Sequence, residues 1–251
     1  MKKSILACVA IGLVLTFGSI AMAGINPGTG ISQTSHDLSS GGVGAAYVGA
    51  GTADNLDRIC IYCHAPHHTI DAATAAANSV TYFPLWNHAI TTVATYQTYT
   101  DGSDTPNGIQ HQLNASLSPT LGSVSKLCLS CHDGSLAISA YGYAPSSTLG
   151  NTAGTKIAGR FKLGGGTQDL RNHHPIGFNY DAVAAIDDEI NPSTSGLLGA
   201  NTYGLTIGDL LWNGKMECST CHDVHNTKNE GSKFTWVQDT RSNLCLTCHN
   251  K

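Results

Sequence analysis

The longest apolar stretch of the chain lies at its N-terminus. Residues 5–20 are almost uninterruptedly apolar, two lysines precede them, and Ala21-Met22-Ala23 forms a small-x-small tripeptide before Gly24. A basic start, an apolar run of this length and small residues before a cleavage point are typical of a secretory signal peptide. The run is also short for a membrane span. The pattern predicts a signal peptide over residues 1–23, an exported protein that is periplasmic or extracellular, and no membrane span after cleavage.

Elsewhere the hydrophobic pattern supports only short elements. Apolar and polar residues alternate over Ile90–Thr100 and Phe234–Val237, which predicts two short strands. The alanine-rich segment Asp71–Asn78 and the segment Thr120–Leu127 each favour a short helix. Gly, Pro, Asn and Ser interrupt the rest too often for longer elements. We therefore expect mostly irregular coil with a few short helices and short strands.

The composition indicates that side chains alone cannot form an ordinary core in a chain of such short elements. The chain has 251 residues, of which 12% are charged, and it contains 28 glycines. Its 13 basic residues against 17 acidic ones exclude a basic nucleic-acid binder. Leu, Ile, Val and Phe are too sparse for an ordinary two-layer core. We therefore expect a bound group to fill much of the interior.

The cysteines indicate what this group is. Cys8 lies in the predicted signal peptide and would be lost on its cleavage. Every other cysteine belongs to a Cys-x-x-Cys-His motif. The four motifs pair Cys60 with Cys63, Cys128 with Cys131, Cys218 with Cys221 and Cys245 with Cys248, and they end at His64, His132, His222 and His249. This motif attaches c-type haem through two thioethers, and its histidine becomes the proximal iron ligand. Paired zinc ligands or a redox dithiol would not require a histidine after every pair. The sequence predicts four covalently bound c-type haems, and the fold class is a multihaem cytochrome c whose coil wraps around a haem stack.

Histidines also dominate the remaining candidates for axial ligands. Eight histidines lie outside the motifs, whereas Met216 is the only methionine after the signal peptide. Bis-histidine ligation is therefore expected at most or all irons. A six-coordinate iron has no open position for a substrate, so the expected role is electron transfer and not enzymatic catalysis. Without a methionine ligand, low reduction potentials are expected.

Several histidines are candidates for the distal positions. His67 and His225 each follow a proximal histidine by three residues, a short link that would hold neighbouring haems close together. Asp37 follows His36 and can orient its ring. His173 and His174 are adjacent, so one of them is expected to be spare. The secondary candidates, more readily explained as structural or surface residues, are His68, His88 and His111.

The arrangement of these motifs resembles a known family. The segments Cys60-Ile-Tyr-Cys-His-Ala-Pro-His67 and Leu127-Cys-Leu-Ser-Cys-His-Asp-Gly134 resemble the first half of the doubled Cys-x-x-Cys-His cytochromes. Residues 174–178, 217–226 and 244–251 resemble the second half. Within this family the chain is most similar to the OmcE-like tetrahaem cytochromes, which polymerise into extracellular nanowires.

The resemblance implies more than the spacing alone. It implies the distal ligands His36, His67, His174 and His225, with His67 reaching a haem of the next subunit. The family usually has a small or polar residue at the position of His68 and an acid or Asn at that of His173, which leaves an ambiguity of one residue at each place. The implied partners are further copies of the chain in a head-to-tail filament, together with redox proteins or extracellular electron acceptors.

The motif intervals suggest two modules within one haem-cored unit. The first di-haem module is expected over residues 24–150 and the second over residues 151–251, joined by a Gly/Ser/Thr-rich stretch. Two other functions stay open at this point. One is a monomeric periplasmic shuttle or electron-transfer subunit of a reductase. The other is a catalytic multihaem reductase, which would need a five-coordinate iron.

Overall fold

The computed structural model describes a large part of the chain after the predicted signal peptide. The described residues are 30–48, 53–54, 56–66, 76–77, 85–99, 117, 121, 123–142, 154–166, 168–199, 203–227 and 234–251. The signal peptide and the predicted module boundary at residue 150 lie outside them, and the two-module division stays a prediction. No helix in these ranges is long and apolar enough to cross a membrane.

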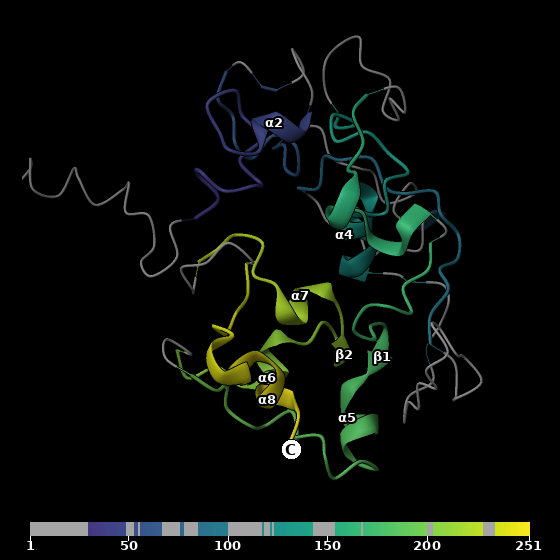
Figure 1. Ribbon diagram of the computed structural model, residues 1–251, viewed down its shortest axis with the longest axis vertical. Coiled ribbons are helices and arrows are strands. Elements are labelled where there is room, and N and C mark those ends of the chain that lie inside the picture. The colour runs from purple at the N-terminus through teal and green to yellow at the C-terminus, as the bar shows by residue number, and fades with distance from the viewer. Residues whose placement is uncertain are drawn as a thin grey trace, which may run out of the picture.

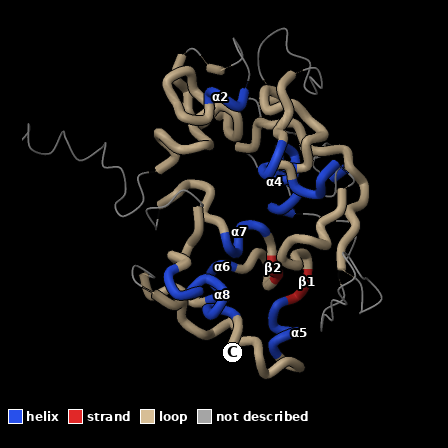
Figure 2. The backbone as a smooth tube through the Cα atoms, in the orientation of Figure 1, coloured by secondary structure: helices blue, strands red, loops and turns tan. Residues whose placement is uncertain are grey.

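Short elements separated by long loops make up this part of the chain (Figure 2). The α-helices are α2 (Ala45–Val48), α4 (Ser123–His132), α5 (Tyr180–Ala184), α6 (Ile207–Leu210), α7 (Cys218–Cys221) and α8 (Asn243–Cys248). The 3-10 helices are η3 (Gly159–Phe161), η4 (Leu163–Gly166) and η5 (Thr240–Ser242). The strands β1 (Phe178–Asn179) and β2 (Lys215–Met216) pair antiparallel, with Phe178 opposite Met216. The expectation of mostly coil with a few short elements is confirmed.

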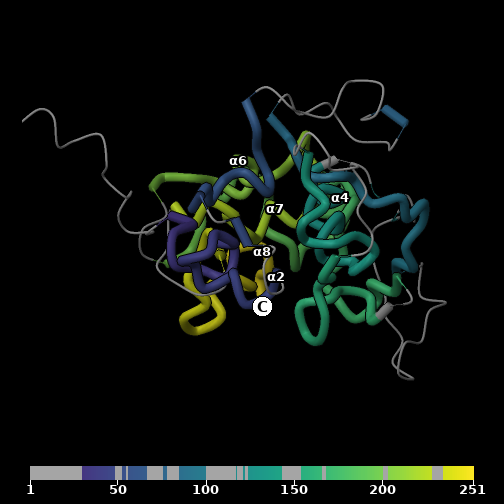
Figure 3. The backbone as a smooth tube through the Cα atoms, turned by 90° about the horizontal axis from the view of Figure 1, so that it is seen from above, coloured from purple at the N-terminus to yellow at the C-terminus, as the bar shows by residue number. Residues whose placement is uncertain are grey.

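The helices lie in two groups (Figure 1). Helices α2 and α4 lie in one half of the view, and α5, α6, α8 and the two strands lie in the other, with α7 next to α4. Seen from above, the segment around α2 and the segment around α4 lie on opposite sides, with α7 between them (Figure 3). Helix α7, in the second half of the chain, packs against α4 in the first half.

The apolar core is divided into small clusters. One consists of Tyr180, Leu197, Ile207, Met216 and Val237, and a second of Tyr96, Leu121, Leu129 and Leu170. A third joins Val48, Tyr62 and Ile138, and a fourth joins Leu136, Ala137 and Ala140. A single large core normally supports a domain of this length. The division into small clusters agrees with the scarcity of large apolar residues.

The sequence-based predictions of individual elements had different outcomes. The helix expected after Thr120 is confirmed by α4. The strand expected over Ile90–Thr100 is wrong for residues 90–99, which form coil with a single bridge from Gln97 to Asp169. The strand expected over Phe234–Val237 is also wrong, because Thr235 makes one isolated bridge to His222. Each segment makes one isolated bridge and no ladder, and the left-handed φ of 53° at Phe234 interrupts the extended backbone of the second segment. Most of the helix expected over Asp71–Asn78 lies outside the described residues.

Candidate metal centres

The second Cys-x-x-Cys-His motif lies on the longest helix of the described chain. Cys128, Cys131 and His132 form the last turn and a half of α4, so both thiols lie one turn apart on the same helix. Leu129 is fully buried and fixes the orientation of the helix against its apolar cluster. The helix ends at His132, and Gly134, two residues later, has the positive φ of 68° that is common just after a helix C-terminus.

The other three motifs share one backbone contact despite different surroundings. The amide of the motif histidine donates to the carbonyl of the first cysteine, over 2.8 Å from His64, 3.1 Å from His222 and 2.9 Å from His249. This contact closes one helical turn. Helices α7 and α8 end there, because His222 and His249 have extended backbone. The single turn brings two thiols and one imidazole to the same side of each motif.

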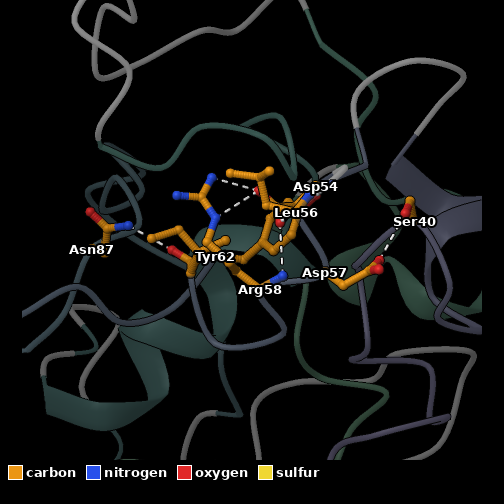
Figure 4. A network of polar contacts seen from close by, with 8 residues as sticks. Ser40, Asp54, Leu56, Asp57, Arg58, Tyr62 and Asn87 are labelled. Carbon is orange, nitrogen blue, oxygen red and sulfur yellow. Dashed lines mark hydrogen bonds and ion pairs between the residues drawn. The ribbon is translucent and has the colours of Figure 1, made fainter.

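The first motif forms this turn without belonging to a helix. Its support is a polar network around Asp54, shown in Figure 4. The Asp54 carboxylate accepts from Nε and Nη2 of Arg58 over 3.0 and 2.6 Å, and the Asp54 amide donates to the Tyr62 hydroxyl over 2.8 Å. Asn87 donates to the Ile61 carbonyl over 2.6 Å. Side chains outside the motif therefore hold its backbone in place.

Three of the four motif histidines face a second histidine. The ring centroids are 6.0 Å apart for His64 and His225, 6.1 Å for His132 and His36, and 6.2 Å for His249 and His174. An imidazole nitrogen binds a metal ion at about 2.0 Å, so two imidazoles on opposite sides of one ion have centroids about 6 Å apart. All three separations fit an ion between the rings.

Backbone carbonyls orient two of these rings. Nδ1 of His132 lies 2.9 Å from the Phe161 carbonyl, and Nδ1 of His174 lies 2.9 Å from the Pro175 carbonyl. A metal-binding histidine usually donates its other N–H to such an acceptor, which fixes the tautomer. Nδ1 of His64 is buried and, among the described residues, makes no hydrogen bond of standard geometry; burial lowers the pKa of this ring, and the Leu85 carbonyl offsets only part of that effect.

Burial favours the neutral, metal-binding form of four of these rings by lowering their pKa values. Burial, together with the nearby imidazoles of His132 and His222, lowers the pKa of His36 to about 4. Burial is also the largest cause of the lowered pKa values of His64, His132 and His249. A neutral imidazole has the lone pair that a metal ligand needs.

Two spare histidines have other contacts. Both ring nitrogens of His88 lie near carbonyl oxygens, with Nδ1 2.7 Å from Ala89 and Nε2 3.2 Å from Ala137. Nε2 of His173 accepts from the Gly164 amide over 3.4 Å. The ring that faces His249 is the one of His174, so the structure separates the two adjacent histidines. His67, His68 and His111 lie outside the described residues.

The motif cysteines are free thiols in residues that are exposed or partly exposed, although many protein atoms surround several of the sulfurs. Burial raises the pKa of Cys63 to about 11 and that of Cys221 to about 12, and it also raises that of Cys131. A thiol with a raised pKa is a poor nucleophile and a poor zinc ligand. In the described part of the chain no group of three or more His, Cys, Asp or Glu side chains could hold a bare metal ion.

Motifs two and three are in direct contact. The thiols of Cys128 and Cys218 hydrogen-bond each other, which raises the pKa of Cys128 and lowers that of Cys218. Ser125 on α4 accepts from the Cys218 amide over 3.0 Å and donates to the carboxyl group of Glu217. Burial raises the pKa of Glu217. This polar contact holds α7 against α4.

Sequence reasoning did not find a set of buried aspartates beside the histidines. Asp37, Asp133 and Asp223 each follow a candidate ligand directly, and each is at most 4% exposed. Each carboxylate accepts the amide two residues further on, from Ser39, Ser135 and His225, respectively. The expectation that Asp37 orients the His36 ring is corrected, because the Asp37 carboxylate accepts hydrogen bonds from Gln33 and Ser39 in its own loop. The recurring His-Asp pair was the available signal.

The residues fit a haem better than a bare ion. Each histidine pair would hold a haem iron through its two imidazoles, and the two thiols next to one histidine of each pair would attach the porphyrin. The histidine pairs combine residues far apart in the sequence, and each contains one motif histidine. The arrangement can hold six-coordinate iron between partly exposed and exposed histidines.

Comparison with known proteins agrees with this fit. The family described as "Doubled CXXCH motif" matches residues 213–251, which contain the third and fourth motifs. No curated protein matches the chain. The chain thus carries a doubled motif typical of multihaem c-type cytochromes, and the motifs indicate covalently bound haem and electron transfer. Cytochromes of this kind are usually exported.

Proposed function

We propose that this protein is an exported tetrahaem c-type cytochrome that carries electrons through closely spaced bis-histidine haems. The observation that carries the proposal is that three motif histidines each face a second histidine at 6.0–6.2 Å between ring centroids. Such a pair leaves no iron position for a substrate, which supports electron transfer over enzymatic catalysis. Each haem would supply one-electron chemistry at its iron.

The haems are numbered by motif from 1 to 4. The facing pairs assign His225 to haem 1, His36 to haem 2 and His174 to haem 4. Of the distal ligands implied by the resemblance, His67 is then assigned to haem 3, whose proximal ligand is His222. The chain itself would position these ligands, and burial favours the neutral ring of His36 by lowering its pKa to about 4.

Contacts between motifs support a continuous series of haems. After burial, Cys63 is the next cause of the raised pKa of Cys131, so the thiols of motifs one and two lie near each other. Cys128 and Cys218 join motifs two and three, and Cys248 likewise raises the pKa of Cys221. The link from His222 to His225 also ties haem 3 to haem 1 through three residues. Neighbouring attachment sites thus lie side by side along the series.

We further propose that the protein is the subunit of an extracellular electron-conducting filament. The resemblance to OmcE-like cytochromes supports this, with His67 crossing to haem 3 of the next copy. A ligand that crosses in one direction makes a heterologous interface, which polymerises when it does not close into a ring. The low charged fraction of 12% is compatible with such packing. Electrons would enter and leave through redox proteins or extracellular acceptors.

The haem count and ligation test the first proposal. A pyridine haemochrome assay with the mass of the intact protein should give four haems per chain. The electron paramagnetic resonance spectrum of the oxidised protein should be low-spin throughout. Fewer than four haems, or a substantial high-spin ferric signal in the native protein, would contradict it and revive the reductase alternative.

Electron microscopy of the cell-surface fraction tests the filament. The wild type and a His68→Ala variant should form filaments, whereas His67→Ala should give monomers with one haem that has lost a ligand. The adjacent histidine controls for changes in the loop itself. Filaments of His67→Ala, or a monodisperse monomeric wild type, would support the soluble shuttle, whose partner binding should weaken with salt.

A further inference from the structure

The two ligands of haem 2 are each followed by a buried carboxylate. Asp37 follows His36 and is 1% exposed, and Asp133 follows His132 and is 2% exposed. The His36 and His132 rings are the pair 6.1 Å apart. The inference below rests on the proposed binding of a haem between them.

Both side chains are surrounded by hydrogen-bond donors. Asp37 accepts from the Gln33 amide over 2.8 Å and from the hydroxyl of Ser39 over 2.6 Å. Asp133 accepts from the Ser135 amide over 2.7 Å, from Thr91 Oγ1 over 2.6 Å and from the Tyr96 hydroxyl over 2.8 Å. A carboxylate is the form that accepts at both oxygens. The contacts therefore stabilise a negative charge at each position.

Neither carboxylate is neutralised by a direct ion pair among the described residues. Within the described ranges, the ion pairs join Arg58 to Asp54, Arg171 to Asp169 and Lys251 to Glu189, and neither Asp37 nor Asp133 takes part in one. The charge of Asp133 reaches the adjacent imidazole, because it raises the pKa of His132 against the effect of burial. Buried charges are screened by salt far less than exposed ones.

The other two described ligand pairs have different neighbours. Haem 4 lies between His174, followed by Pro175, and His249, followed by Asn250. The nearby Glu189 is 56% exposed and is paired with Lys251 over 2.7 Å. At haem 1, His64 and His225 are followed by Ala65 and Asn226, and among the described residues the single buried carboxylate next to this pair is that of Asp223, which accepts from the His225 amide over 3.2 Å. Only at haem 2, among these three pairs, does an aspartate follow both ligands.

We propose that Asp37 and Asp133 give haem 2 the lowest reduction potential of the three haems whose ligand pairs the structure describes. Reduction adds one electron to the iron and neither forms nor breaks a bond. Two fixed negative charges nearby oppose the added electron, and the opposition is strong where water is excluded. Haem 2 would therefore be the most oxidised of the three at any given potential, and electrons would pass from it readily to its neighbours.

The Asp133→Asn variant removes the charge while it can keep the hydrogen bonds of this side chain. The amide oxygen can accept from Ser135, and the amide nitrogen can donate to the hydroxyl oxygens of Thr91 and Tyr96, which accept as well as donate. The substitution thus removes the charge and keeps a partner for each donor. At Asp37 the same exchange places an amide nitrogen against a backbone N–H, so Asp37→Asn is the less clean second variant.

The experiment is a spectropotentiometric titration of the intact holoprotein at fixed pH. In Asp133→Asn the step with the lowest potential should rise, with about a tenfold larger ferrous-to-ferric ratio at a fixed potential, or about 59 mV. Asp37→Asn should move the same step in the same direction. Tyr96→Phe removes a donor to Asp133 but keeps the charge, and Asp181→Asn removes an exposed charge, so neither should raise this step.

Two results would overturn the proposal. One is a lowest step that stays unchanged in both Asp133→Asn and Asp37→Asn. The other is an equal rise of the lowest potential in Tyr96→Phe. That result would show that the lost hydrogen bond to Asp133, and not the removed charge, shifts the potential. A haemochrome count on each sample separates these results from failure of the proposed function, because a chain without haems would show no redox steps at all.

Discussion

Motifs one and two have the same residue types at their fixed positions but are held in different ways. In motif two, Cys128–His132 ends a ten-residue helix whose Leu129 is fully buried. In motif one, Cys60–His64 forms turns outside any helix and depends on the polar contacts of Asp54. Both nevertheless place a histidine opposite a second histidine at about the same separation. The five residues of the motif thus specify one turn of backbone. The residues on either side of the motif determine whether apolar packing or hydrogen bonds stabilise that turn.

The flanking residues explain this division. Ser123-Val-Ser-Lys-Leu before motif two continues without a helix breaker into the motif, so the helix extends through it. Before motif one, the Asp54 carboxylate binds the amides of Leu56 and Arg58 over 3.2 and 2.8 Å. Aspartate in this role competes with helix formation and favours a turn. We therefore expect motif two to depend mainly on apolar packing and motif one on hydrogen bonds.

Truncation of the residue after the first cysteine should give the largest contrast between the motifs. Leu129→Ala should lower the free energy of unfolding by about 2–4 kcal/mol, because it leaves a cavity in the cluster with Tyr96 and Leu170. Ile61→Ala at the matching position should cost about 1 kcal/mol or less, because Ile61 is only partly buried. Urea unfolding of the holoprotein, followed by circular dichroism, measures both. An equal loss would mean that motif one also depends on packing.

The next position offers a comparison of buried hydrogen bonds. Tyr62→Phe removes the acceptor of the Asp54 amide, and Ser130→Ala removes the acceptor of the Thr91 amide over 3.0 Å. Each variant leaves a buried N–H unsatisfied, so each should cost about 1–2 kcal/mol. Hydrogen exchange should increase at Asp54 in the first variant and at Thr91 in the second. Exchange that rises throughout the chain in either variant would contradict a local role.

Sequence reasoning predicted the coil-rich fold and helix α4 but overestimated the strands. The segment around Gln97 alternates as a strand does, yet it pairs with Asp169 through only one bridge. Alternation reports which side chains can be buried, whereas a strand also needs a partner of matching length. That partner depends on contacts between distant segments, which the local pattern does not contain.

The candidate site was partly readable from the sequence. The motif histidines follow from their spacing, and the resemblance implied His36, His174 and His225 as distal ligands. Their pairing was not readable, because His225 follows the third motif and yet faces His64 of the first. The buried state of Asp133 was equally hidden, because its partners Thr91 and Tyr96 come from a segment about forty residues earlier. Burial of this kind is set by tertiary packing.

The smallest predicted effect concerns the ion pair that supports motif one. Arg58 is half exposed, so Arg58→Ala should lower the free energy of unfolding by about 0.5–1 kcal/mol at about pH 7. Hydrogen bonds from Arg58 are the largest cause of a pKa of Asp54 below its ordinary value. Because that pKa is lower in the folded chain than in the unfolded one, the pair stabilises the fold above the unfolded pKa. The contribution is lost as the pH falls through the folded value.

This pH dependence separates the pair from the packing around motif two. The difference in unfolding free energy between wild type and Arg58→Ala should shrink as the pH falls from about 7 to about 3, whereas the cost of Leu129→Ala should stay nearly constant. Arg58→Lys keeps the charge but loses the two-nitrogen contact with Asp54, so it should fall between wild type and Arg58→Ala. A difference for Arg58→Ala that is independent of pH would assign the role of Arg58 to the packing of its aliphatic stem. Motif one would then depend on burial in the same way as motif two.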